Sequence, residues 1–245
     1  MPRKPRYFEQ GYVYHAVQRG NNKADIFFDE EDYRIFLKLM CESKKMYPCL
    51  IYAYCLMRNH LHLLIEAIKQ NSISLFMKYL TGNYVLYINR KYNRTGTLFG
   101  SRFKAGLVQT EKYFANCMRY IDRNPVRAKL VQTPAQYPWS SYNFHTSPGS
   151  SLILNHHSLY LEMGKNIDDC RLQYKKFVLD QVEDETILQL IRARTNKSGV
   201  IGTDAYIKAL TSKTKVDMLC RSVGRQKKGS DTINLSTELS TFNCV

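Results

Sequence analysis

The sequence lacks the cysteine motifs that build zinc ribbons. Its seven cysteines are scattered and no C-x-x-C pair occurs, so no such metal module is expected. The odd cysteine count and the lack of a signal peptide favour a reducing compartment. No apolar run approaches the roughly 20 residues that a membrane-spanning helix needs. We therefore expect a soluble, cytoplasmic protein without a membrane partner.

Acidic residues are scarce. The chain has 21 Asp and Glu against 36 Lys and Arg, a net charge of +15. Such an excess does not help folding and indicates a polyanionic partner. Nucleic acid is the first candidate, and an anionic membrane surface is the second. Residues 1–145 carry 22 of the basic side chains against 10 acidic ones, so most of the excess lies there. The chain also has 18 tyrosines, and basic with aromatic side chains suit phosphate contact and base stacking.

Hydrophobic periodicity and turn residues predict alternating strands and helices. We expect strands over 11–19, 49–55, 60–66 and 96–108, helices over 29–46, 72–93 and 111–122, and a short helical piece over 126–130. This order is that of the ferredoxin-like split β-α-β pattern. It predicts an α+β fold, with an antiparallel sheet that carries helices on one face and leaves the other free for a ligand.

A polar stretch over 146–157 predicts a domain boundary. At 245 residues the chain can hold one domain plus an appendage. We expect a catalytic domain over 1–145 and a helical C-terminal extension over 158–220. Residues 222–245 are rich in Ser, Thr, Lys and Asn, which predicts a disordered tail.

The most distinctive local pattern is His60-Leu61-His62, within a predicted strand. Successive strand side chains point to opposite faces, so both imidazoles project from the same face. Neutral imidazole is a common ligand for divalent metals. The competing interpretation is a pair of solvated histidines without a ligand, and this pattern alone does not decide between the two.

The predicted third helix offers Tyr120 and Asn124, which share one face at i and i+4. An amide oxygen is an acceptable ligand for Mg²⁺ or Mn²⁺. A neutral phenol is a weak nucleophile, but a metal that polarises a phosphate makes its attack feasible. A structural aromatic is the alternative role for Tyr120. Tyr113, earlier in the same helix, is off the Asn124 face and is the weaker candidate nucleophile.

Five segments resemble the HUH-type single-tyrosine transposases, in particular the REP-associated tyrosine transposases. They lie in that family's order across residues 11–142. The His-Leu-His triplet is highly specific once it is combined with the downstream Tyr-x-x-x-Asn-Pro and the Arg-Gly-Asn turn. The matching segments are Tyr14–Asn21, Ala53–Leu64, Gly96–Lys104, Arg119–Ala128 and Tyr137–Tyr142.

The resemblance implies a metal-dependent transposase that acts on single-stranded DNA with hairpin-bearing ends. His60 and His62 would bind Mg²⁺ or Mn²⁺, with Asn124 as third ligand. Tyr120 would attack a phosphodiester, giving a 5′-phosphotyrosine and a free 3′-hydroxyl, and a second strand end would then complete strand transfer. The bond energy is conserved in the tyrosine ester, which agrees with the lack of a P-loop in the sequence.

Turn and strand-end residues on a basic face can reach DNA phosphates. The candidate contacts are Arg19, Asn21, Asn59, Arg102, Lys104 and Arg123. Asp122 departs from the family's pattern, and we expect it on the helix face opposite Tyr120. We expect His15 to be a structural or DNA-facing strand residue.

Two other functions stay open on the sequence. One is a non-catalytic module that binds structured nucleic acid, such as a domesticated transposase. The other is a metal-dependent RNA endonuclease, which would form no covalent intermediate. The sequence also leaves open whether the protein is a monomer or a homodimer, and whether Tyr120 serves the histidines of its own subunit.

Overall fold

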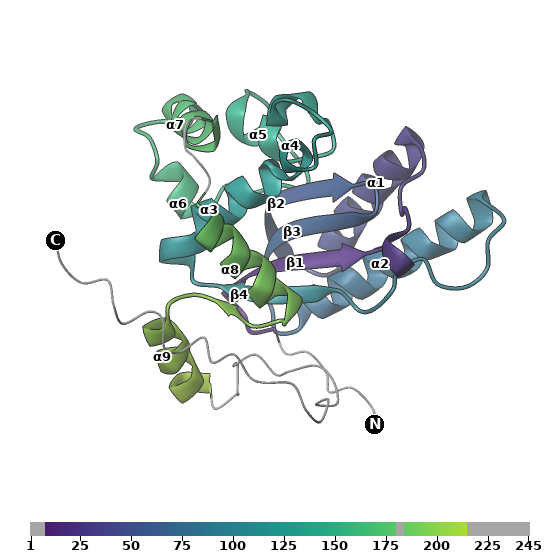
Figure 1. The fold of residues 1–245 in the computed structure, drawn as a ribbon, viewed down its shortest axis with the longest axis horizontal. Helices are drawn as coiled ribbons and strands as arrows, with labels where there is room; N and C mark the ends of the chain where they lie inside the picture. Colours follow the sequence, from purple (N-terminus) through teal and green to yellow (C-terminus); the bar gives the residue numbers. More distant parts are fainter. Residues whose placement is uncertain (1–7, 180–183, 215–245) are drawn as a thin grey trace.

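Five strands form one sheet at the centre of the protein (Figure 1). The computed structural model describes residues 8–179 and 184–214. The strand order is β2-β3-β1-β4-β5, with antiparallel pairing from β2 to β4 and parallel pairing between β4 and β5. The bounds are β1 Val13–Arg19, β2 Cys49–Met57, β3 His60–Ala67, β4 Lys104–Val108 and β5 Val200–Ile201. The α+β fold and the split β-α-β order are thus confirmed.

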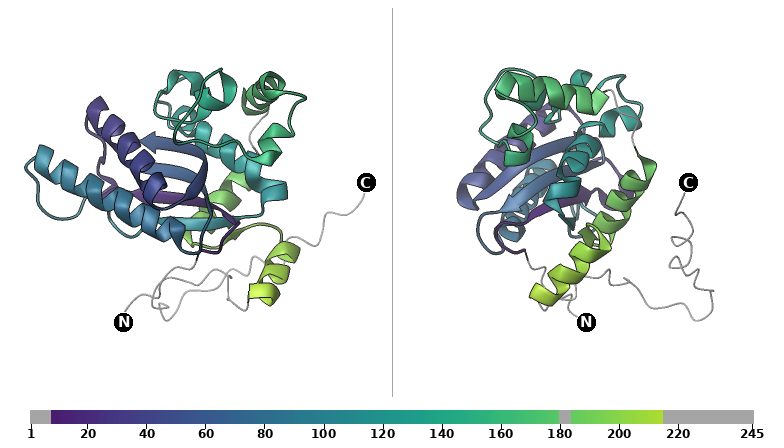
Figure 2. Two further views of the ribbon diagram at one scale, coloured as in Figure 1. Left: turned by 180° about the vertical axis from the view of Figure 1, so that it is seen from behind. Right: turned by 90° about the vertical axis from the view of Figure 1, so that its left-hand side faces the viewer.

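Two long helices cover one face of the sheet (Figure 2). They are α1 (Glu30–Met46) and α2 (Ser72–Lys91). Their buried side chains, such as Phe36 and Leu80, join the strand residues Leu61 and Leu63 in one core. The N-terminus of α1 is fixed by a capping box between Asp29 and Asp32.

The opposite face of the sheet is also covered, so the expectation of helices on one face only is wrong. Some side chains of β2 point to this side of the sheet. Among them, Cys55 and Met57 pack with Phe114 and Ile191 in a second core. Figure 1 shows α8 crossing in front of β1 and β4. The helices that contact the strands on this side are α3 (Thr110–Asp122) and α8 (Glu185–Asn196), and α4 (Asn124–Arg127), α6 (Ser158–Leu161) and α7 (Ile167–Leu179) pack against α3.

The C-terminal extension also contributes to the sheet itself. Strand β5 pairs in parallel with β4, with Leu107 opposite Val200, whereas the four expected strands pair antiparallel as predicted. The strand expected over 96–108 covers only its last five residues, as β4. The remaining elements are η1 (Asn21–Lys23), η2 (Pro134–Gln136), α5 (Tyr142–Thr146) and α9 (Asp204–Thr214). The predicted disordered tail, 222–245, lies outside the described residues.

Within residues 8–179 and 184–214, none of the helices combines the length and the apolar character that a membrane span requires.

Candidate active site

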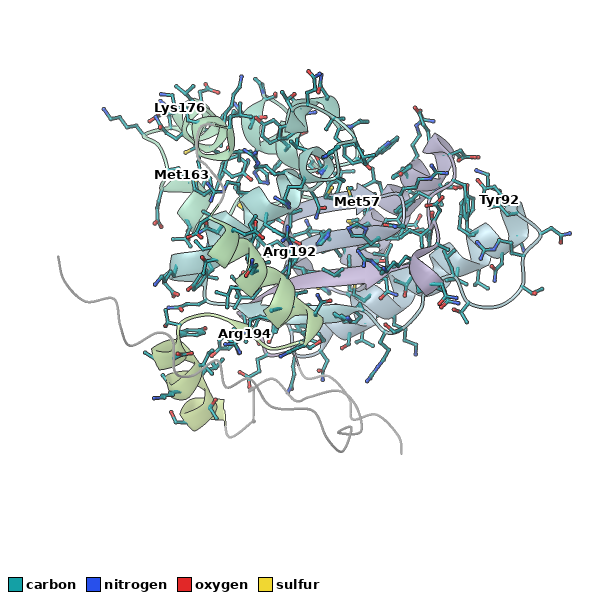
Figure 3. All side chains as sticks on the ribbon, viewed as in Figure 1. Met57, Tyr92, Met163, Lys176, Arg192 and Arg194 are labelled. Carbon is teal, nitrogen blue, oxygen red and sulfur yellow. The ribbon has the colours of Figure 1, made fainter. Side chains whose placement is uncertain are left out.

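A pocket of about 390 Å³ opens where the polar face of the sheet meets α3, α4 and α8. Arg192 lies on the part of α8 that crosses the strands (Figure 3). Sequence-distant segments therefore meet at one cavity. Its lining includes His15, Val17 and Arg19 of β1, His60 and His62 of β3, Ser101 and Arg102 before β4, Lys104 of β4, Tyr120 of α3, Asn124 and Arg127 of α4, Ala128 after α4, and Arg192, Thr195 and Asn196 of α8.

Strand alternation brings the two histidines of β3 to this pocket. His60 lies opposite Arg19 of β1, and His62 lies opposite Val17. Leu61, between them, is fully buried in the core on the other face. The two imidazoles are neighbours, with ring centroids 5.0 Å apart. The strand therefore presents both side by side, as its period of two residues requires.

Each of these imidazoles uses its Nδ1 atom for a hydrogen bond within the protein. His60 Nδ1 lies 2.6 Å from Asn59 Oδ1. The Asn59 amide nitrogen donates to the Lys23 carbonyl, which leaves the oxygen facing His60. His62 Nδ1 lies 2.9 Å from His15 Nε2. The Nε2 atoms of His60 and His62 are therefore the ring nitrogens that can bind a metal.

Burial keeps the imidazoles of His15, His60 and His62 uncharged at neutral pH. Burial lowers the pKa of His60 to about 4, with a smaller effect from Arg19. It lowers the pKa of His15 to about 3, and that of His62 well below its usual value. A neutral imidazole has a free lone pair, which is the form that binds a metal.

Tyr120 lies beside the same imidazoles. Its side chain is buried, and its ring meets the His62 ring edge to face, with centroids 5.7 Å apart. The Arg127 guanidinium lies 4.4 Å from the centre of the Tyr120 ring and also donates to the Tyr120 carbonyl oxygen. The Arg192 guanidinium lies 6.0 Å from the same ring. A phenol, imidazoles and guanidiniums thus meet within a single chain.

The donor set fits a divalent cation held at an open site. Among the described residues, no group of three or more His, Cys, Asp or Glu side chains could hold a metal. His60, His62 and Asn124 instead offer two imidazole nitrogens and one amide oxygen around the same pocket. Such a mixed set suits Mn²⁺ or Mg²⁺ when water and phosphate oxygens complete the coordination shell.

The pocket is strongly cationic. Arg19, Arg102, Lys104, Arg127 and Arg192 line it, and none of its described lining residues is acidic. Such a field attracts phosphate groups. Three of the predicted DNA contacts therefore belong to the pocket wall.

The structure places the other predicted DNA contacts differently. Asn59 orients His60, as described above. Asn21 and Arg123 are not among the lining residues. Asn21 begins η1, and its backbone donates to the Leu98 carbonyl. Arg123 donates to the Val178 carbonyl of α7 at 2.8 Å, so packing between helices accounts for its position.

Asp122 points away from the pocket into the second core. It is fully buried and accepts hydrogen bonds from Ser141 and Tyr174, each 2.7 Å long. Burial raises the pKa of its carboxyl to about 7, although both hydrogen bonds oppose the shift. Asp122 therefore joins α3 to α7 and does not face the nucleophile.

Sequence reasoning missed several residues of the site. His15 shares the β1 face of Arg19 at even spacing, a signal that could have placed it beside the histidine pair. Arg127 lies within a segment that carries the family resemblance. Arg192 and Thr195 come from the extension, where only the docking of α8 brings them to the pocket.

Comparison with known proteins gives a family match, a sequence relative and a structure of similar fold. Residues 9–124 match the family described as "Transposase IS200 like". A Haemophilus influenzae protein that bears the name of a REP-associated tyrosine transposase is 25% identical over 150 residues, covering 56% of this chain and 84% of its own. A solved structure of a REP-associated tyrosine transposase bound to a REP hairpin aligns with a TM-score of 0.52 at 16% identity. That alignment covers 64% of this chain and 93% of the other, which is a likeness of fold.

Proposed function

We propose that the protein is a metal-dependent transposase that cleaves and rejoins single-stranded DNA through a covalent tyrosine intermediate, because residues 9–124 match the family described as "Transposase IS200 like". The observation that supports this most is the meeting of Tyr120 with the neutral pair His60 and His62 in one cationic pocket. The family's activity is DNA strand cleavage and transfer, and this pocket offers the groups that such chemistry uses.

In the proposed reaction the phenol oxygen of Tyr120 attacks the phosphorus of a phosphodiester. The bond from phosphorus to the 3′ oxygen breaks, the 3′ oxygen leaves as a hydroxyl, and the phenol loses its proton. Arg127 and Arg192 lie over the tyrosine ring and can hold the phosphate oxygens during attack. His60, His62 and Asn124 would hold a divalent cation, Mg²⁺ or Mn²⁺, whose chemistry is the polarisation of that phosphate.

The second step reverses the first with a different strand. A 3′-hydroxyl from another end attacks the phosphotyrosine, the new phosphodiester forms, and Tyr120 regains its proton. The number of phosphoester bonds is unchanged, so the reaction needs no nucleotide cofactor. This balance is what makes a tyrosine ester suitable for strand exchange.

We propose hairpin-bearing single-stranded DNA as the substrate. The Haemophilus influenzae relative is REP-associated by name, and the solved structure of similar fold is bound to a REP hairpin. Arg19, Arg102 and Lys104 at the pocket wall provide phosphate contacts for such a strand. We also propose that the protein acts in the cytoplasm.

The nucleophile is proposed to act with the histidines of its own subunit. Tyr120 and His62 already have ring centroids 5.7 Å apart within one chain. A mixture of Tyr120→Phe and His60→Ala proteins tests this. Action within one subunit predicts that the mixture forms no covalent product, whereas activity restored by mixing would show a site shared between two subunits.

The decisive experiment incubates the protein with a single-stranded DNA hairpin and Mn²⁺, followed by a denaturing gel. We expect a covalent protein–DNA adduct that disappears with chelator and in Tyr120→Phe. Tyr113→Phe is the matched control, because Tyr113 is also a buried tyrosine of α3, and this variant is expected to keep the adduct. Cleavage without an adduct would favour a nuclease, and binding without either would favour a non-catalytic module.

A further inference from the structure

We propose that Thr195, on α8 of the C-terminal extension, is a positioning residue for His62 and acts through His15. The proposal rests on the proposed function in one respect, that His62 is a metal ligand. It assigns to the extension a part in building the metal site. Nothing in the sequence of the extension indicates this role.

Three side chains from three separate elements form one continuous line of hydrogen bonds. Thr195 Oγ1 lies 2.8 Å from His15 Nδ1, and His15 Nε2 lies 2.9 Å from His62 Nδ1. The exposed fractions are 3% for Thr195, 1% for His15 and 4% for His62. Water therefore has little access to replace a lost partner, and each group depends on the next one.

Metal binding gives this line of hydrogen bonds a single direction. A neutral imidazole that binds a cation through Nε2 carries its proton on Nδ1. His62 then donates to His15 Nε2, so the proton of His15 must be on Nδ1 and is donated to Thr195. The hydroxyl oxygen of Thr195 is the final acceptor. In the opposite direction the proton occupies His62 Nε2 and blocks the ligand atom.

A glycine allows α8 to come close enough for this contact. Gly106 of β4 lies opposite His15 of β1 in the sheet. A Cβ atom built at Gly106 would lie only 3.2 Å from the Thr195 Cα atom. One residue later on α8, Asn196 accepts a hydrogen bond from Lys104 of β4 at 3.0 Å. The end of α8 is thus held directly over the strands that carry the histidines.

The test measures Mn²⁺ binding to the full chain by calorimetry, without DNA. Thr195→Val keeps the shape of the side chain but removes the acceptor, and we expect its Kd for Mn²⁺ to rise roughly 10- to 100-fold. Thr195→Ser keeps the acceptor and is expected to stay within about twofold of the parent. Thr211→Val on α9 is the matched control, because that hydroxyl donates only within its own helix, and its Kd should be unchanged.

Unfolding and hairpin binding, both measured in EDTA, separate positioning from general damage. We expect Thr195→Val to bind the DNA hairpin with the affinity of the parent chain, because the basic residues that line the pocket are unchanged. If Thr195→Val does not fold, the Mn²⁺ affinity of Thr195→Cys is compared with that of the parent instead. The thiol has a similar size and is only a weak hydrogen-bond acceptor. A folded Thr195→Val or Thr195→Cys with the parent's Mn²⁺ affinity overturns the proposal.

Failure of the inference and failure of the proposed function give different results. If His62→Ala abolishes Mn²⁺ binding and Thr195→Val leaves it unchanged, only the positioning role is wrong. If the parent chain binds no Mn²⁺, or binds it equally well without His60 and His62, the proposed metal site is wrong and this inference fails with it.

Discussion

The contact between β4 and α8 at Gly106 makes Gly106→Ala an informative perturbation. The added Cβ atom would lie 3.2 Å from Thr195 Cα and 3.2 Å from Ile201 Cδ1. Carbon atoms pack best at about 3.5–4.0 Å, so α8 must move by roughly half an ångström. The hydrogen bond between Thr195 and His15, now 2.8 Å, would lengthen to about 3.3 Å, beyond its favourable range.

The expected cost of Gly106→Ala follows from this displacement. Overpacking a tight contact costs about 1–3 kcal/mol, and the reduced freedom of the unfolded chain returns at most about 1 kcal/mol. We therefore expect a net loss of about 1 kcal/mol, and at most about 3 kcal/mol, in the free energy of unfolding. A weakened Mn²⁺ affinity should accompany the loss, because the orientation of His62 depends on the same contact.

Urea unfolding in EDTA and Mn²⁺ calorimetry on the same preparations measure both effects. Gly82→Ala is the control, since Gly82 lies within α2 and has open space where a Cβ atom would be. That variant is expected to gain about 0.5–1 kcal/mol from helix propensity and to bind Mn²⁺ normally. A Gly106→Ala protein that is as stable as the parent and binds Mn²⁺ equally well would refute the described seating of α8 on β4.

Three further predictions concern the surroundings of the site. The pKa of Asp122 is raised to about 7 by burial, so the stability that its protonated form contributes is lost as pH rises from about 4 through 7. In urea unfolding, the free energy of unfolding of Asp122→Asn should rise relative to that of the parent by up to ~4 kcal/mol across this pH interval. If the free energy of unfolding of the two proteins has the same pH dependence, Asp122 is not a buried neutral carboxyl. Asn59→Ala removes the acceptor of His60 Nδ1 and should weaken Mn²⁺ binding in calorimetry about tenfold; unchanged affinity would show that Asn59 does not orient the ring. Arg127→Ala should slow single-turnover adduct formation by roughly 10²–10³ with Mn²⁺ affinity kept, because its guanidinium lies over Tyr120; a normal rate would place the phosphate elsewhere.

The local parts of the site could be predicted from sequence because they follow from local geometry. A strand period of two residues is enough to put His60 and His62 on one face. Tyr120 and Asn124 both line the pocket, although α3 ends at Asp122 and Asn124 begins α4, so the two residues do not belong to one continuous helix as expected. The split β-α-β order could be read in the same way from the alternation of strand and helix patterns.

The sequence of β2 indicates that both faces of the sheet are covered, which differs from the expectation of one open face. Strand β2 reads Cys-Leu-Ile-Tyr-Ala-Tyr-Cys-Leu-Met, and nearly every position is buried. A continuous apolar run is typical of a strand covered on both faces, whereas a face left open to a ligand would alternate apolar with polar residues.

The contribution of the extension could not be predicted, because it depends on where a distant helix docks. Thr195 and His15 are 180 residues apart, and their hydrogen bond is set by the packing of α8 on β4. The environment of Arg123 depends on packing in the same way. Its charge predicts a DNA contact, which stays a prediction, and its position between packed helices gives it a hydrogen bond to the Val178 carbonyl.

The identity of the residue joined to DNA is the most direct test of the mechanism. Trypsin cuts after Arg119 and Arg123, which isolates Tyr120 in a peptide of known sequence with a single tyrosine. Mass spectrometry of the digested adduct is predicted to find the nucleotide phosphate on that peptide. A phosphate on any other residue, or an adduct that persists in Tyr120→Phe, would contradict attack by this phenol.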